Sequence, residues 1–344
     1  MYRSTTLLGA AFWMALTTAT LSNATSPTEL SAAEPAAPLR VGIIGLDTSH
    51  SIAFTEVLNR ENNTGDLAGV RVVAAFPGGS PDIPESINRV ADYTQKLRDK
   101  GITIVDSIDA LVAGVDVVLL ESVDGRPHLA QAIPVFKAKK PVFVDKPVAG
   151  TLADAIEIYR LAAESGTPCW SSSSLRFSPG ILGMRNDDRV GKVLGCEARG
   201  PCPIEPHHPD LFWYGIHGTE TLFTIMGPGC KSVTRTHTPG TDLVVGVWND
   251  GRIGSFRGIR DGKGDYGAMV FGSKANLPSG GYAGYEPLVV EIAKFFKTGK
   301  PPVSAAETLE IYAFMQAADE SKQQGGASVS IESVLEKAKG KTGK

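Results

Sequence analysis

The stretch Leu39-Arg40-Val41-Gly42-Ile43-Ile44-Gly45 decides the fold. It is a short apolar run that ends in glycine, which is typical of a buried strand followed by a tight turn. Residues 51–59 then have apolar positions at helical spacing, and residues 70–76 form a second apolar run that stops at Pro77-Gly78-Gly79. Strands that are apolar throughout and alternate with helices predict a parallel sheet covered on both faces.

The same alternation continues along the first half of the chain. The sequence predicts helices over 87–100, 108–112 and 128–138, and strands over 102–105, 115–120 and 141–144. We therefore expect a Rossmann-like, doubly wound α/β domain over residues 39–150, with its ligand site at the carboxyl ends of the strands. A helix over 151–165 and a strand over 168–171 are expected to pack on this domain.

The pattern changes beyond residue 178. Alternating or short apolar runs predict strands at 192–198, 242–248, 252–257 and 266–271, with Asn249-Asp250-Gly251 as a hairpin turn. Helices are expected at 287–296 and 305–321. Residues 151–330 therefore predict an α+β domain with a mainly antiparallel sheet, through which copies of the chain could associate as a homo-oligomer. Residues 331–344 are expected to form a frayed tail.

The amino terminus predicts export. Residues 7–16 are an apolar run too short to span a bilayer, and small residues at 22–24 resemble a cleavage site. We interpret residues 1–24 as a signal peptide and residues 25–38 as a linker, which predicts a periplasmic or extracellular protein. An uncleaved N-terminal anchor is the alternative.

Composition and charge narrow the class of protein. The 344 residues are 42% hydrophobic and 21% charged, and 34 basic against 37 acidic side chains give a formal charge of -3. This near balance gives no general attraction to nucleic acid or to an anionic membrane. Of the four cysteines, Cys196 and Cys202 are close enough to form a disulfide, whereas Cys169 and Cys230 stand apart; burial of all four as small hydrophobic residues is favoured.

The turn after the first strand departs from the dinucleotide-binding sequence G-x-G-x-x-G. Gly45 occupies the first glycine position, Leu46 follows it, and Asp47 and His50 occupy the second and third glycine positions. Phe76 ends the second strand, where an NAD site often has an acidic ribose partner. Asp47 is therefore expected to weaken dinucleotide binding by charge repulsion, unless the cofactor shifts or a cation binds there.

A second set of polar residues follows the fourth and fifth strands. Glu121, Asp124 and His128 follow one strand and Asp145 follows the next, so we expect them to face the same crevice as the first turn. Carboxylates together with imidazoles suit Zn²⁺, Mn²⁺ or Fe²⁺. The alternative to a cofactor site is thus a metal site formed by Asp47, His50, Asp124 and His128, and the simplest alternative to both is helix capping.

Several motifs resemble the Gfo/Idh/MocA oxidoreductase family over nearly the whole mature chain. Asp145-Lys146-Pro147 is similar to the family's Glu-Lys-Pro, and Gly215-Ile216-His217 followed by Glu220 is similar to its G-x-H-x-x-D. The resemblance implies that Lys146 contacts cofactor and substrate and that His217 is the acid/base. The cofactor-binding residues would then be Gly45, Leu46, Asp47, His50, Glu121, His128, Asp145 and Lys146. Trp213 stands where the family usually has an Asp.

Three further residues are candidates for substrate contact. Arg176 follows a run of serines and could hold an anionic or polyhydroxyl ligand, His208 lies in a Pro-rich loop, and Glu220 is three residues after His217 on one helix face. Surface charges and a surface ion pair are the alternative interpretation of all three.

Three functions remain open from the sequence. The first is an NAD(P)-dependent oxidoreductase that acts on a sugar, a cyclitol or a related polyhydroxyl compound. The second is a hydrolase or lyase of the same fold that acts on a carbohydrate without hydride exchange, with a divalent metal or an acid/base pair. The third is a non-enzymatic binding protein. The enzyme hypotheses predict that Lys146 and His217 lie within reach of one small ligand.

Overall fold

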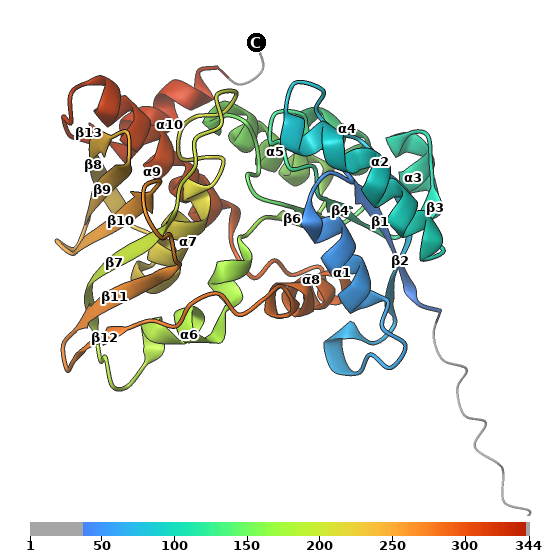
Figure 1. Ribbon diagram of the computed structural model, residues 1–344, viewed down its shortest axis with the longest axis horizontal. Helices are drawn as coiled ribbons and strands as arrows, with labels where there is room; N and C mark the ends of the chain where they lie inside the picture. The colour runs from blue at the N-terminus through green and yellow to red at the C-terminus, as the bar shows by residue number, and fades with distance from the viewer. Residues whose placement is uncertain (1–36, 342–344) are drawn as a thin grey trace, which may run out of the picture. The chain divides into compact units, whose positions relative to one another are not determined.

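The computed structural model describes residues 37–341. The predicted signal peptide and nearly all of the predicted linker lie outside the described residues. The described chain forms two sheets, one of six strands and one of seven, with helices packed on both (Figure 1).

The first sheet is parallel and has the order β3-β2-β1-β4-β5-β6. This order reverses between β1 and β4, which places a ligand site at the carboxyl ends of those strands. The predicted Rossmann-like α/β fold is confirmed. Its strands are β1 (Leu39–Ile44), β2 (Val70–Phe76), β3 (Thr103–Ile104), β4 (Val117–Leu120), β5 (Val142–Val144) and β6 (Cys169–Trp170).

Helices cover both faces of this sheet because both faces are apolar. One face packs against α1, α2 and α8, and the other packs against α3, α4 and α5. Helix α8 comes from the far end of the chain, and in Figure 1 it lies beside α1. The bounds are α1 (Ser49–Leu58), α2 (Pro84–Asp99), α3 (Ile108–Gly114), α4 (His128–Lys137), α5 (Leu152–Ser165) and α8 (Glu286–Thr298).

The second sheet has the order β12-β11-β7-β10-β9-β8-β13 and is antiparallel except for the β7–β10 pair. Helix α7 packs against β7 and β10, and α9 packs against β8. The predicted hairpin turn at residues 249–251 joins β9 to β10. The bounds are β7 (Val193–Pro201), α7 (Gly215–Met226), β8 (Cys230–Thr238), β9 (Thr241–Trp248), β10 (Ile253–Ile259), β11 (Gly267–Gly272), β12 (Asn276–Pro278), α9 (Ala305–Gln323) and β13 (Val329–Ser330).

Short helical segments connect the two sheets. They are η2 (Ser174–Phe177), α6 (Pro179–Leu182) and η3 (Gly183–Asn186), whereas η1 (Gly65–Leu67) lies between α1 and β2. Segment η2 and helix α7 are in contact, so the end of the first sheet is held directly against the helix that covers the second sheet.

Two predictions about the second half need correction. The sequence predicts a tail from residue 331, but α10 (Ile331–Lys339) is a helix whose Ile331, Val334 and Ala338 are buried. These positions are three or four residues apart and form one apolar face that packs on α9 and α5, so the helix is held in place by tertiary contacts. Strand β8 was not predicted, because its polar residues hide the alternation.

The four cysteines are free and buried, as the favoured interpretation has it. Burial raises the pKa of the Cys169 and Cys196 thiols to about 12, so both stay protonated at neutral pH. Across residues 37–341, none of the helices has both the length and the apolarity that a membrane crossing requires.

Candidate active site

A cavity of about 560 Å³ lies where the carboxyl edge of the parallel sheet meets the second half of the chain. A volume in this range suits a small-molecule ligand. Lys146 and His217 both line it, as the enzyme hypotheses require. The lining also includes Thr48, Ser49, His50, Trp213, Tyr214, Tyr266, Tyr282 and Tyr285.

The turn after β1 is closely packed. Gly45 has φ +92°, and a Cβ at this position would lie 2.4 Å from the backbone nitrogen of Ser122. Only glycine is tolerated there, because both the conformation and the space exclude a side chain. The Gly45 and Leu46 amides donate to the Phe76 and Pro77 carbonyls at 2.9 and 2.6 Å, so the segment after β2 closes over the turn.

Asp47 points into the protein and away from the cavity. Its carboxylate is fully buried and accepts hydrogen bonds from the Ser86 hydroxyl at 2.6 Å and from the Val123 amide at 3.0 Å. Burial raises its pKa. Asp47 thus ties the turn to helix α2 and to the loop after β4.

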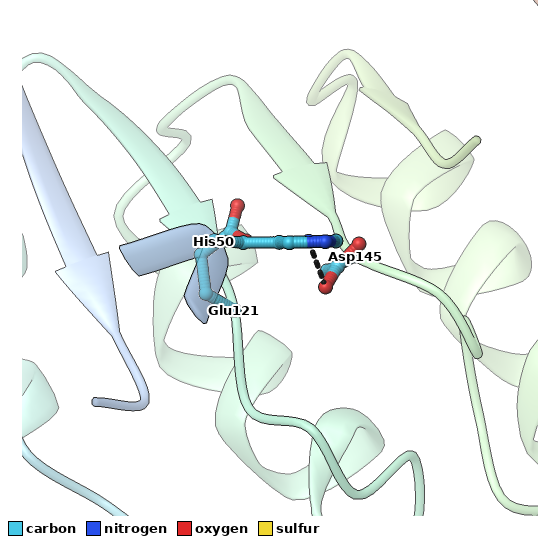
Figure 2. A group of neighbouring side chains, drawn as sticks. All are labelled: His50, Glu121 and Asp145. Atoms are coloured by element: carbon cyan, nitrogen blue, oxygen red, sulfur yellow. Dashed lines mark ion pairs between the residues drawn. The ribbon is translucent and has the colours of Figure 1, made fainter. Parts of the chain in front are cut away.

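His50 lies in the first turn of α1 and contacts two carboxylates. Its Nδ1 is 2.8 Å from Asp145 Oδ2 and 3.8 Å from Glu121 Oε2 (Figure 2). Glu121 follows β4 and Asp145 follows β5, and both are fully buried. Within the part of the chain that the structure describes, this is the group of three ligand-type side chains that could hold a metal ion.

The two carboxyl groups titrate differently because their neighbours differ. Burial raises the pKa of Glu121 well above its usual value, and the charge of Asp145 adds to this. Burial alone would also raise the pKa of Asp145, but His50 and Lys146 outweigh it and hold the pKa below its usual value. The pair therefore shares its negative charge unequally, with Asp145 ionised first.

The other residues of the predicted metal set have internal partners. Asp124 accepts hydrogen bonds from Ser80 and Arg126, and its Oδ1 is 3.0 Å from His208 Nε2. His128 Nε2 donates to the Ser122 carbonyl at 2.8 Å. The predicted metal set of Asp47, His50, Asp124 and His128 is therefore wrong as a set. Only His50 belongs to the converging group, because the other three are engaged elsewhere.

His217 lies on α7 and faces the cavity. Its Nδ1 is 2.7 Å from Ser173 Oγ, and the rings of Tyr214 and Tyr266 pack edge-on against the imidazole. Burial lowers the pKa of His217 well below its usual value, and the positive charge of Lys146 lowers it further. The imidazole is therefore neutral at pH 7 and can accept a proton.

The residues predicted to contact substrate are buried in the protein framework. Glu220 accepts from Ser172 Oγ, from the Ser173 amide at 2.7 Å and from Arg176 Nε at 2.7 Å. Arg176 also pairs with Glu307 on α9 at 2.8 Å. The cavity lining contains neither Arg176 nor Glu220 nor His208. Instead, Arg176 and Glu220 join α7 to η2 and α9, whereas His208 pairs with Asp124 and Glu205.

Sequence reasoning missed the aromatic lining. Trp213 was noted only as a departure from the family pattern, and Tyr266 only as part of a strand. Tyr282 and Tyr285 lie in and beside the Gly-rich segment 280–284, which reaches the cavity from the second half of the chain. Tyrosines beside glycines in a loop were the available signal, because such a loop has little reason to carry aromatic residues for packing alone.

The sheet order and the position of the cavity define a Rossmann-type protein with its site at the carboxyl edge of the sheet. Residues 39–173 match the sequence model of the GFO_IDH_MocA family, described as an oxidoreductase family with an NAD-binding Rossmann fold. The resemblance predicted from the sequence is confirmed over these residues, which form the Rossmann-type first domain.

Known proteins resemble this chain over part or most of its length. Inositol 2-dehydrogenase 1 of Saccharopolyspora erythraea is 29% identical over 160 residues, which are 45% of this chain and 42% of that protein. The chain thus spans less than half the length of this curated relative.

Solved structures share the fold at low sequence identity. A probable dehydrogenase from Thermotoga maritima has a TM-score of 0.70 at 22% identity, covering 86% of this chain and 100% of that one. An oxidoreductase from Agrobacterium radiobacter, solved with NAD+, L-tartaric acid and magnesium, has a TM-score of 0.68 at 16% identity, covering 86% and 99%.

Proposed function

We propose that the protein is a nicotinamide-dependent oxidoreductase that acts on a sugar, a cyclitol or a related polyhydroxyl compound. The observation that carries this proposal is the presence of Lys146 and His217, from opposite halves of the chain, in the lining of one cavity. The family description and the inositol dehydrogenase relative support the same class of reaction. The metal-dependent hydrolase or lyase and the non-enzymatic binding protein lack such support.

The residues fit a dinucleotide at its phosphate and nicotinamide end. Thr48 caps α1, and with Ser49 it lines the cavity, so the amino end of a ten-residue helix opens on the site. Such a helix end attracts phosphate. Asp47 is bonded inward and so does not take up the phosphate path, contrary to the repulsion that the sequence suggested. Phe76 offers no acidic partner to a ribose, so the adenosine end is held by contacts other than the usual carboxylate.

His217 and Lys146 supply the proton chemistry in this proposal. The nicotinamide, when bound, would supply the acceptor or donor of the hydride. When Nδ1–H of His217 donates to Ser173 Oγ, its Nε2 is left as the base for a substrate hydroxyl proton. The ammonium of Lys146 stabilises the negative charge that develops on the same oxygen. Ser173 acts as a positioning residue.

The aromatic lining supports a polyhydroxyl substrate. Tyr214, Tyr266, Tyr282 and Tyr285 line the cavity, and tyrosine rings can pack on the C–H surface of a sugar or cyclitol ring while their hydroxyls bond its oxygens. Such a site has apolar walls with a few well-placed polar groups, which is the usual composition of small-ligand pockets.

The test is turnover of the purified chain with NAD+ or NADP+ and a panel of inositols and aldoses, followed by the absorbance of reduced nicotinamide. His217→Asn should lower kcat by about 10²–10⁴-fold, and Lys146→Met should lower it as well. His207→Asn is the matched control, because His207 is exposed and lies outside the cavity lining. Full activity in the His217 and Lys146 variants would refute the assigned roles.

We also propose that the protein is exported, on the basis of the apolar run at residues 7–16 and the small residues that follow it. N-terminal sequencing of the native protein should begin between about residues 25 and 34. An intact Met1 in a cytoplasmic fraction would contradict this proposal.

A further inference from the structure

Three neighbouring segments each bring one ligand-type side chain to a buried group, of which His50 lines the cavity. His50 comes from the first turn of α1, Glu121 from the end of β4 and Asp145 from the end of β5 (Figure 2). The ligand atoms of all three lie within 4.8 Å of one another. Because β1, β4 and β5 are adjacent in the sheet, the fold itself brings the three groups together.

The oxygens of Glu121 lack the partners that a buried carboxylate needs. Both are fully buried, and neither has a hydrogen-bond partner in the described structure. Asp145 differs from Glu121, because its Oδ2 is paired with His50 Nδ1 at 2.8 Å. A buried carboxylate is normally paired, hydrogen-bonded or bound to a metal.

Neighbouring buried carboxylates show that this chain satisfies such groups elsewhere. Asp47 accepts two hydrogen bonds, from Ser86 and Val123. Asp124 accepts from Ser80 and Arg126, and Glu220 accepts from two serines and an arginine. Among these buried carboxylates, the lack of partners for both oxygens is therefore particular to Glu121.

The local charge also favours a cation. Two carboxyl groups face each other, and the cationic side chain that acts on both is Lys146. When both carboxyl groups are ionised, one ammonium does not neutralise them, and burial prevents water from screening the remaining charge.

We propose that His50, Glu121 and Asp145 bind one divalent transition-metal cation of the Zn²⁺ or Mn²⁺ type. An imidazole with two carboxylates suits these metals, whereas Mg²⁺ and Ca²⁺ prefer oxygen ligands alone. Donors about 2.1 Å from a tetrahedral ion lie about 3.4 Å apart. The His50 nitrogen lies 2.8 Å and 3.8 Å from the two carboxylate oxygens, so small shifts complete the site.

Three protein ligands leave at least one coordination position open. His50 itself lines the cavity, together with Lys146, so the open position is reached from the side on which substrate binds. The metal would therefore be in contact with the ligand space rather than sealed in the framework. This inference does not depend on hydride chemistry.

The test measures metal binding by the full chain directly. Chelator-treated protein is titrated with Zn²⁺ and with Mn²⁺ by calorimetry, and Co²⁺ is added as a spectroscopic probe. We expect one equivalent to bind, and Glu121→Gln to weaken binding by at least about a hundredfold. Glu85→Gln is the matched control, since Glu85 is an exposed carboxylate that lines the same cavity outside the group.

A second measurement keeps the Glu121 variant interpretable. The Tm of metal-free Glu121→Gln should equal or exceed that of the metal-free parent, because the change removes an unpaired buried acid. Zn²⁺ should raise the Tm of the parent and of Glu85→Gln, but not of Glu121→Gln. Absence of binding in the parent, or equal binding in Glu121→Gln, would overturn the site. Neither readout involves turnover, so failure here leaves the proposed oxidoreductase function standing.

Discussion

Two groups of buried charges lie beside the cavity, and they are built differently. In the first, Arg176 joins Glu220 to Glu307, and Glu220 receives further hydrogen bonds from serines. In the second, Asp145 is paired with His50, but neither oxygen of Glu121 has a hydrogen-bond partner. The residue types are similar, so it is the hydrogen-bonding of the carboxylates that separates a framework from a site able to take a ligand.

The largest expected effect is on the Arg176 group. Arg176→Met leaves Glu220 and Glu307 without their cation in a buried setting, which should lower the free energy of unfolding by about 3–5 kcal/mol. Denaturant unfolding measures this change. Arg189→Met is the control, because Arg189 forms an exposed ion pair with Asp187 and should cost less than about 1 kcal/mol. If both variants lost the same free energy of unfolding, the buried Arg176 group would contribute no more to stability than an exposed ion pair.

A smaller effect concerns His217 and pH. Burial holds the pKa of His217 below its value in the unfolded chain, so the unfolded chain binds more protons as pH falls below about 6.5. The free energy of unfolding should therefore fall as pH is lowered through this window, by up to about 1.4 kcal/mol per pH unit.

The control for this pH dependence is His217→Asn. In this variant the free energy of unfolding should depend less steeply on pH, because the contribution of His217 is removed. The contribution of His128 remains, since burial lowers the pKa of His128 as well. Unfolding curves at several pH values measure both. An unchanged slope in the variant would show that His217 titrates normally in the folded protein.

The smallest expected effect is at the residue that joins the two halves of the site. Ser173 contacts His217 through its hydroxyl and Glu220 through its amide. Ser173→Ala keeps the amide and removes the hydroxyl, so stability should fall by only about 1 kcal/mol. In the proposed reaction kcat should fall while KM changes little, because the imidazole loses its orienting partner. A fall in stability with full kcat would limit Ser173 to a structural role.

The first domain could be predicted in detail because its information is local. Each strand from β1 to β6 is a short apolar run next to a helix, and the handedness of the connections then orders the sheet. The position of Lys146 at the end of β5 follows from the same pattern. His217, the other proposed catalytic residue, was predicted only from the family resemblance. No local property of the α7 sequence shows which face of the helix meets the edge of the sheet.

The predictions from sequence that the structure corrects have a common physical cause. The roles of Arg176 and Glu220, the inward turn of Asp47 and the helix α10 all depend on contacts between segments far apart in sequence. A buried ion pair and a substrate-binding charge have the same residue types in the sequence. They differ only in whether a partner such as Glu307 is present, and that partner lies more than a hundred residues away.

The position of helix α8 limits where the chain can be truncated without exposing the core. Its Val289, Ile292 and Phe295 share one apolar cluster with Phe54 of α1 and with Trp170 of β6. A fragment that stops at residue 173, the end of the family match, would leave that side of the Rossmann sheet bare. We therefore expect that residues 39–173 do not fold on their own. We expect the two halves of the protein to fold only when they are part of the same chain.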